Sequence, residues 1–157
     1  MVKKKSKSSI GKILNRRASH DYVLGDVITV GLVLTGAETK SLRMGHGHLQ
    51  GAYVTVKDHA LWLVNATISG TSGVPIPEDD QSRSRKLLAK QREIDRLLAS
   101  KEQGNTIVPL EIITGGKFIK LKIAVGRGKK QYDKRASLKK RETDRKIQST
   151  IKNQLKE

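Results

Sequence analysis

The segment NTIVPLEIITGGKFIKLKIAVG, residues 105–126, places two runs of β-branched and aliphatic residues on either side of Gly115-Gly116. Paired glycines between such runs are typical of the tight turn of an antiparallel hairpin, because glycine readily adopts the left-handed backbone that this turn needs. After the turn, side chains alternate at period two, as in a strand with one buried face. The alternation sets Ile119, Leu121 and Ile123 against Phe118, Lys120 and Lys122. Residues 105–126 are therefore predicted to form a β-hairpin, which commits this part of the chain to an antiparallel sheet.

Other segments carry a similar strand pattern. Residues 26–36 predict a strand with a bulge or bend at Gly31, and its apolar face holds Ile28, Val30, Leu32 and Leu34. Residues 49–68 predict a second hairpin that turns at Lys57-Asp58, while residues 15–25 fit either a short helix or an edge strand. About six short antiparallel strands close most economically into a barrel, because closure removes the sheet edges. The predicted fold is mainly β, an OB-like antiparallel β-barrel with peripheral short helices.

The clearest helical pattern lies in RSRKLLAKQREIDRLLAS, and it predicts an amphipathic helix at about residues 83–100. The residues that recur at helical spacing are Leu87, Leu88, Gln91, Ile94, Leu97 and Leu98. The acidic loop that ends at Ser82 suits a helix N-terminus, and Gly104 suits the end of the helix. Arg83, Arg85 and Lys86 would lie in the first turn, where cations oppose the helix dipole. Cations in that place suggest an anionic partner.

The net charge of +17 is concentrated at the two ends of the chain. Residues 1–17 hold seven basic side chains and no acid, and residues 126–157 hold twelve basic and four acidic ones. The span 18–125 has thirteen basic and eleven acidic side chains, so a nearly neutral centre carries two basic arms. Such arms repel themselves and stay disordered until a polyanion condenses them. Nucleic acid is the expected partner, since phosphate contacts release counterions, and neither arm has the bulky apolar face that would insert into a membrane.

The candidate catalytic and ligand-binding patterns are weak. GRGKK at residues 126–130 lacks the first glycine and the final serine or threonine of a Walker A loop. His46 and His48 offer two imidazoles without an evident third ligand, and the chain has no cysteine, so no metal site is predicted. No nucleophile motif such as Gly-x-Ser-x-Gly occurs. We expect a non-enzymatic protein without a cofactor, soluble and cytoplasmic, because the charged N-terminus has no apolar stretch behind it and no run approaches a membrane span.

Two charged segments have open interpretations. In GAETKSLRMG, residues 36–45, the charges of Glu38, Lys40 and Arg43 fit a ligand-binding segment or a solvated β-edge. In the tail, Ile147, Ile151 and Leu155 recur every four residues, but an isolated helix of this kind is marginal in water. The tail is therefore predicted to be disordered when free and to fold on a polyanion.

Four ordered segments together resemble one known family. They are NRRASHDY, GLVLTGAETKSLRMG, RSRKLLAKQREI and GRGKKQYDKRASLKKRETDR. The chain is similar over nearly its whole length to the small protein B (SmpB) family, the transfer-messenger-RNA-binding proteins of bacterial ribosome rescue. The resemblance implies a basic flexible N-terminal arm at 1–14, an OB-like RNA-binding barrel at 15–125 and a basic tail at 126–157. That tail would be disordered when free and helical on the ribosome.

The resemblance also implies which residues bind. The barrel would bind the tRNA-like domain of transfer-messenger RNA through Asn15, His20, Tyr22, Glu38, Lys40, Arg43, Arg85, Lys86 and Leu88. The tail would enter the decoding centre and the empty messenger channel of the small ribosomal subunit through Gly128, Lys129, Lys130, Tyr132, Asp133, Lys134, Arg135, Lys139 and Arg141. Elongation factor Tu would be an indirect partner through the aminoacylated RNA. The alternatives are a ribosomal protein that binds ribosomal RNA constitutively and a nonspecific DNA-coating protein.

Overall fold

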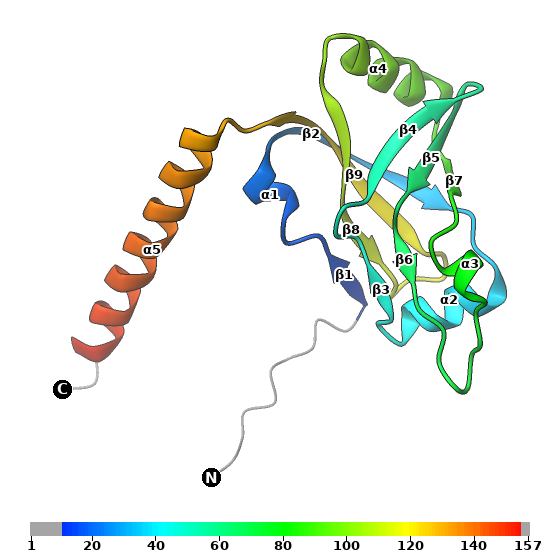
Figure 1. Cartoon of the computed structure of the whole chain (residues 1–157), viewed down its shortest axis with the longest axis horizontal. Coiled ribbons are helices and arrows are strands. Elements are labelled where there is room, and N and C mark those ends of the chain that lie inside the picture. Colours follow the sequence, from blue (N-terminus) through cyan, green and yellow to red (C-terminus); the bar gives the residue numbers. More distant parts are fainter. Residues whose placement is uncertain (1–10, 155–157) are drawn as a thin grey trace.

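A closed ring of six antiparallel strands forms the centre of the protein (Figure 1). The computed structural model describes residues 11–154. The ring contains β2 (Tyr22–Leu32), β4 (Tyr53–Lys57), β5 (Ala60–Val64), β7 (Arg85–Leu88), β8 (Thr106–Ile113) and β9 (Lys120–Gly128). Its order is β8-β4-β5-β7-β2-β9, and β9 pairs back onto β8. The predicted mainly β fold of about six antiparallel strands is confirmed.

Within residues 11–154, three short strands lie outside the ring. β1 (Lys12–Leu14) pairs with β8, so residues at the end of the predicted N-terminal arm belong to the sheet. The rest of that arm, residues 1–10, lies outside the described residues. β3 (Gly47–His48) and β6 (Thr67–Ile68) form a separate two-stranded sheet.

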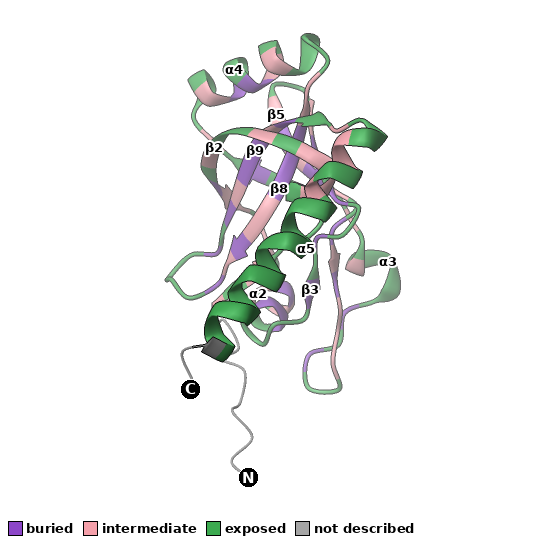
Figure 2. Cartoon of the chain, turned by 90° about the vertical axis from the view of Figure 1, so that its left-hand side faces the viewer, coloured by how far each residue is buried: buried purple, intermediate pink, exposed green. Residues whose placement is uncertain are grey.

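Both predicted hairpins are present, but their turns differ from the prediction. The first turn lies at Asp58-His59 and not at Lys57-Asp58, and the second is a longer connection over residues 114–119 and not a tight turn at Gly115-Gly116. β4 and β5 join at Asp58 and His59, which have φ values of 51° and 55°, as a two-residue hairpin turn of this hand requires. β8 and β9 pair from Ile113↔Lys120 to Thr106↔Gly126. The expected alternation decides which side chains fill the ring, because strand side chains point alternately to its two faces. Figure 2 shows buried and intermediate residues along these strands, and their inner face includes Leu61, Leu63, Ile107, Ile112, Leu121 and Ile123.

The predicted helix at residues 83–100 is wrong in its first half. Residues 85–88 form β7, and the helix α4 runs only over Gln91–Glu102. The side chains of Arg85 and Leu87 are buried, whereas Lys86 and Leu88 are exposed, so this stretch alternates at period two. β7 pairs with both β5 and β2, and those ladders outweigh the local helical preference. The dipole argument for the cations at residues 83–86 therefore fails, since these residues do not begin a helix.

The second half of that prediction is confirmed by α4. Its buried residues Ile94 and Leu97 cover one end of the ring, and Gly104 follows the helix with a φ of 84°. The loop before β7 contains a single turn of helix, α3 (Glu78–Gln81), so its acidic residues cap no long helix.

Residues 36–45 form a helix and not a β-edge. α2 (Gly36–Arg43) begins with a capping box, in which the Thr35 hydroxyl accepts a hydrogen bond from the backbone N–H of Glu38 and the Glu38 carboxylate accepts one from the N–H of Thr35. The ambiguous segment 15–25 contains both alternatives, the short helix α1 (Ala18–Asp21) and the start of β2. The irregularity in β2 lies between Leu24 and Val27, and Gly31 pairs regularly with Lys120 and Leu88, so the bulge predicted there is wrong.

The basic tail forms one helix, α5 (Gln131–Gln154), which extends away from the ring (Figures 1 and 2). No glycine or proline interrupts residues 131–154, and lysine, arginine and glutamine are good helix formers. The structure describes this helical form, while disorder of the free tail stays a prediction. Leu155, the last residue of the expected apolar stripe, lies outside the described residues. Over residues 11–154, no helix is both long and apolar enough to cross a bilayer.

Candidate nucleic-acid interface

Glu38 joins α2 to the segment before β7 through a buried ionic network. Its carboxylate receives Nε and Nη2 of Arg83 at 2.8 and 2.6 Å, Nε of Arg85 at 2.9 Å and the backbone N–H of Thr35 at 2.9 Å. The fork of Arg83 therefore binds the carboxylate through two parallel hydrogen bonds, the strongest arrangement for such a pair. Glu38 and Arg85 have exposed fractions of only 1% and 0%.

Arg85 uses every N–H of its guanidinium inside the protein. Besides Glu38, it donates to the carbonyl oxygens of Ala66, Arg83, Asp80 and Gln81, at 2.8 to 3.0 Å. These five hydrogen bonds account for all five guanidinium donors. Arg85 therefore has no donor left for a phosphate or a base, and its role here is to hold the loop before β7.

The network shifts the pKa values of its members. Burial raises the pKa of Glu38, but the hydrogen bond from Arg83, the N–H of Thr35 and the charge of Arg85 outweigh it and leave that pKa below its ordinary value. The hydrogen bond to Glu38 raises the pKa of Arg83, whereas burial lowers the pKa of Arg85. Glu38 is therefore ionised near neutral pH and acts as the anion that two cations require.

Arg43 braces the turn between β8 and β9. Its guanidinium donates to the carbonyl oxygens of Thr114, Gly116 and Lys117 at 3.3, 3.0 and 3.0 Å. These contacts orient the chain that presents Lys117 and Phe118. Glu38 and Arg43 therefore hold parts of the fold together. Lys40, the third charged residue of α2, is exposed and makes no comparable contact among the described residues.

A groove on the outer face of the ring begins at that turn. We call it the Phe118 groove; it has a volume of about 340 Å³, and its lining includes Gly31, Leu88, Lys117, Phe118 and Lys120. Gly31 lies between Leu88 and Lys120 in the sheet, and a Cβ atom at Gly31 would come within 3.2 Å of the Leu88 Cβ. Because Gly31 has no side chain, the groove stays open between the apolar side chain of Leu88 and the cation of Lys120.

Phe118 is the most exposed of the large hydrophobic side chains described, at 70%. The ammonium of Lys117 lies 5.5 Å from its ring centroid, and Lys120 lines the same groove. An exposed aromatic face beside cations suits an unpaired base and its phosphate.

A second hollow lies at the other end of β2. The Tyr22–Tyr53 pocket has a volume of about 360 Å³, and its lining includes Asn15, Arg17, Tyr22, Gln50 and Tyr53. Asn15 donates to the carbonyl oxygen of Pro109 at 2.9 Å, which fixes the chain where it leaves β1. Tyr22 packs beside Gly126, where an added Cβ would meet the tyrosine side chain at 3.2 Å. Two phenol rings, two amides and a cation give this pocket the groups that bind a base by stacking and hydrogen bonding.

The predicted tail residues divide into two groups. Lys129, Lys134 and Arg141 contact α1, and Asp133 is half-buried beside them. The exposed group consists of Gly128, Lys130, Tyr132, Arg135 and Lys139. His20 belongs to the first contact and not to either hollow, since its Nδ1 lies 2.9 Å from Oδ1 of Asp21. The hydrogen bond from His20 lowers the pKa of Asp21, burial acts in the opposite direction, and the contact with Lys134 lowers that pKa further.

The sequence and the fold were compared with known proteins. A family model described as SmpB protein matches residues 12–153, from β1 to the last turn of α5.

The chain belongs to the SmpB family.

Similar relatives include proteins named SsrA-binding protein. The one from Lysinibacillus sphaericus (strain C3-41) is 41% identical over 145 residues, which is 90% of this chain and 94% of the relative. The one from Pseudomonas entomophila (strain L48) is 40% identical over 157 residues, with 98% of both chains covered. A solved structure described as "tmRNA-SmpB: a journey to the center of the bacterial ribosome" is 36% identical, with a TM-score of 0.65, and the match covers 77% of this chain and 86% of that chain.

The RNA-binding residues expected from the resemblance lie in different places in the structure. Asn15 and Tyr22 line one hollow, Leu88 lines the other, and Lys86 is exposed on the same face of β7 as Leu88. Glu38 and Arg85 meet each other in the interior. In the part of the chain that the structure describes, no three histidine or acidic side chains group as metal ligands.

Sequence reasoning missed Phe118, Lys117, Gly31 and Tyr53 as surface-site residues. Phe118 had a visible signal, because an aromatic residue opposite the buried phase of a strand must face outward. Gly31 had a weaker signal, since a glycine inside a strand marks either a bulge or a close approach. Tyr53 had none, because the Tyr22–Tyr53 pocket combines three separate segments, 15–22, 50–53 and 106–108.

Proposed function

We propose that this SmpB-family protein is a non-enzymatic RNA-binding adaptor of trans-translation in the cytoplasm. It binds the tRNA-like domain of transfer-messenger RNA and delivers it to stalled ribosomes. The observation that carries the proposal is the family match over residues 12–153, supported by relatives named SsrA-binding protein and by the similar structure described with tmRNA and the ribosome.

The ring supplies the RNA-binding surface in this proposal. The Phe118 groove and the Tyr22–Tyr53 pocket are separated by about 30 Å along β2, at a strand rise of about 3.3 Å per residue. Each combines an exposed aromatic ring with at least one cationic side chain, Arg17 in the pocket and Lys117 and Lys120 in the groove. Two stacking sites at this distance favour a folded RNA with exposed bases over a regular duplex, whose bases stay stacked inside.

The tail supplies the ribosome-binding part. α5 has 24 residues and would be about 36 Å long at 1.5 Å per residue. We propose that this helix occupies the decoding centre and the empty messenger channel. Lys130, Arg135 and Lys139 would bind ribosomal phosphates, and Tyr132, exposed at 66%, would stack on an unpaired base. The peptidyl-transfer chemistry stays with the ribosome, and elongation factor Tu would act through the aminoacylated RNA.

A competition titration tests the proposal at fixed salt, because phosphate contacts make every affinity depend on ionic strength. Labelled tRNA-like domain is challenged with ordinary tRNA, ribosomal RNA fragments and duplex DNA. The full chain is compared with a chain that ends at Lys130, since β9 continues to Gly128 and must stay intact. We expect both proteins to prefer the tRNA-like domain by about tenfold or more. If the competitors bind equally and the shortened chain loses nearly all affinity, the protein is a generic polyanion binder and the proposal is refuted.

A further inference from the structure

The turn at residues 114–119 carries the aromatic ring of the Phe118 groove. The ladder between β8 and β9 ends at the pair Ile113↔Lys120, so the turn lies beyond the last strand pairing. It includes two adjacent glycines shortly before Phe118, and glycine has more backbone freedom than any other residue. The position of the exposed ring therefore depends on contacts that hold the turn from outside the sheet.

Arg43 supplies such contacts. Its Nη2 donates to the carbonyl oxygens of Gly116 and Lys117 at 3.0 Å each, and its Nη1 donates to that of Thr114 at 3.3 Å. One guanidinium thus binds three peptide groups of the turn. Because its donors form a rigid planar fork, it also fixes how these carbonyl groups are oriented relative to one another. Phe118 is the next residue after Lys117, so its backbone follows that orientation.

α2 holds Arg43 in a fixed place. The two residues before it, Ser41 and Leu42, both have exposed fractions of 0%. The other end of the helix is fixed by the capping box and by the buried carboxylate of Glu38. Thr39, in the middle of α2, lines the Phe118 groove itself. The helix is therefore packed into the protein beside the groove, and Arg43 connects the turn to this rigid element.

A turn that is held in this way binds a ligand at a lower cost, because an ordered site loses less conformational entropy when the ligand arrives. Arg43 itself is exposed, and the turn uses three of its five guanidinium donors. The remaining donors make a direct contact with RNA the competing role, and this is the role that the resemblance implied.

We propose that Arg43 is a positioning residue of the Phe118 groove, which acts on RNA affinity through the turn at residues 114–119 and makes no contact of its own with RNA. The guanidinium holds the ring of Phe118 where an unpaired base can stack on it. That Arg43 orders the turn stands on the contacts in the RNA-free protein, whereas its effect on RNA affinity rests on the proposed function.

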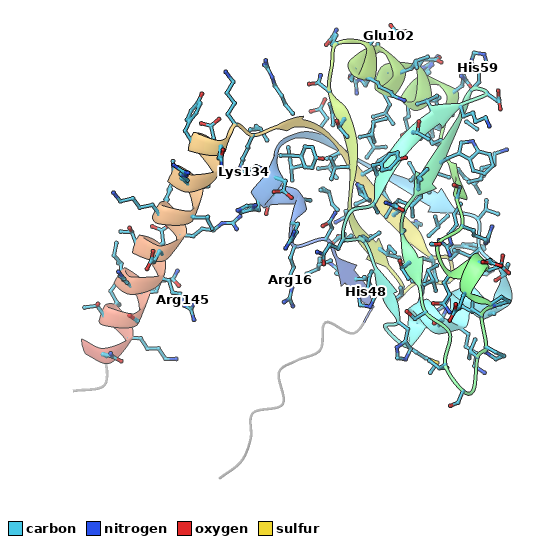
Figure 3. The ribbon with its side chains drawn as sticks, viewed as in Figure 1. Arg16, His48, His59, Glu102, Lys134 and Arg145 are labelled. Carbon is cyan, nitrogen blue, oxygen red and sulfur yellow. The ribbon has the colours of Figure 1, made fainter. Side chains whose placement is uncertain are left out.

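Amide order parameters of the full-length, RNA-free protein test whether Arg43 orders the turn. For residues 115–118 we expect about 0.85 in the wild type, as in rigid backbone, and less than about 0.6 in Arg43→Ala. Arg92→Ala is the matched control, because it removes an exposed arginine of α4 at the end of the ring that Glu102 marks, far from α2 (Figures 1 and 3). This control should leave the turn rigid. Low values already in the wild type, or equal values in wild type and Arg43→Ala, would overturn the proposal.

A double-mutant cycle with the tRNA-like domain tests whether Arg43 acts through Phe118. Arg43→Ala should weaken binding by about five- to tenfold in the wild-type background, up to the loss expected for Phe118→Ala itself. In the Phe118→Ala background, the same substitution should cost no more than about threefold, since only the orientation of Lys117 is then still lost. Losses that multiply would show a direct contact between Arg43 and RNA. An unchanged affinity of Arg43→Ala would exclude a positioning role.

The two measurements separate this proposal from the proposed function. If the wild-type chain does not prefer the tRNA-like domain to ordinary tRNA, the proposed function fails, while the order parameters still decide whether Arg43 holds the turn. If the RNA binds and the turn loosens in Arg43→Ala but the losses multiply, the positioning role is wrong and the proposed function stands.

Discussion

Glu38→Ala is expected to lower the free energy of unfolding substantially. Any loss of RNA affinity is expected to follow from this loss of stability and not from a lost contact with RNA. The substitution removes the carboxylate that binds Arg83 and Arg85 and leaves Arg85 buried at 0% exposure with an uncompensated charge. Removing one partner of a buried ion pair costs about 3–5 kcal/mol. A domain of this size is stable by only about 5–15 kcal/mol in total. The loss corresponds to a fall in Tm of roughly 10–20 °C, at about 3–4 °C per kcal/mol.

Differential scanning calorimetry and urea unfolding measure this loss directly. Glu142→Ala, which removes an exposed carboxylate on α5, is the control and is expected to change the unfolding free energy by no more than about 0.5 kcal/mol. The reasoning is refuted if Glu38→Ala keeps the wild-type Tm while RNA affinity drops. That outcome would make Glu38 a ligand-binding residue, as the resemblance implied, and not the centre of a structural network.

The same network predicts a pH dependence. The pKa of Glu38 in the folded protein lies below its ordinary value of 4.5, so the folded state favours the ionised carboxylate. Its contribution to stability is therefore complete above about pH 4.5 and is lost as the pH falls through the lower pKa of the folded state. In urea titrations between pH 7 and pH 3, Glu38→Gln should lose less stability than wild type. Parallel curves for the two proteins would show that Glu38 does not carry this dependence.

Three further predictions concern the surface and the core. Phe118→Ala should weaken binding of the tRNA-like domain by about tenfold, the usual size of one lost base stack, and leave the Tm unchanged. Phe118→Trp should bind with an affinity near that of the wild type. Equal titration curves for Phe118→Ala and wild type would exclude stacking at this residue. Lys129→Ala together with Lys130→Ala should spare RNA binding in solution but abolish tagging of stalled chains in a reconstituted translation assay, and a large loss of solution affinity would contradict the division between ring and tail. Leu97→Ala should cost about 2–5 kcal/mol in urea unfolding, because this side chain is fully buried between α4 and the ring, and a loss below about 1 kcal/mol would contradict its place in the core.

The hairpins could be predicted because their determinants are local. The alternation in β5 and β9 depends on residues within a few positions of one another, and the turn between β4 and β5 lies one position after the predicted Lys57-Asp58. Side-chain period and turn geometry fix such units before any long-range contact forms. The charge division between the ring and the tail was equally local. The helix of residues 131–154 was predicted only for a tail bound to a polyanion, and a composition without glycine or proline permits it.

The site could be predicted only in part. The motifs led to Asn15, Tyr22 and Leu88, which line surface hollows, and to the family that the comparisons confirm. The same motifs led to Glu38 and Arg85, whose charges look equally available in a sequence. Burial is not visible in a motif, because it depends on partners from distant segments.

The amino-acid sequence by itself determined the antiparallel hairpins, the basic ends and the family, since period, turn residues and charge are properties of neighbouring positions. Tertiary structure alone decided that residues 85–88 are a strand. In isolation RKLL continues a helical pattern. In the folded protein, Arg85 binds the carboxylate of Glu38, which lies 47 positions earlier in the sequence, and Leu87 packs inside the ring. The extended chain places both side chains on the same buried face. The free energy of a satisfied buried charge and of two strand ladders exceeds the few tenths of a kcal/mol per residue by which helix propensities differ. Long-range partners therefore outweigh local preference at the one place where the two conflict.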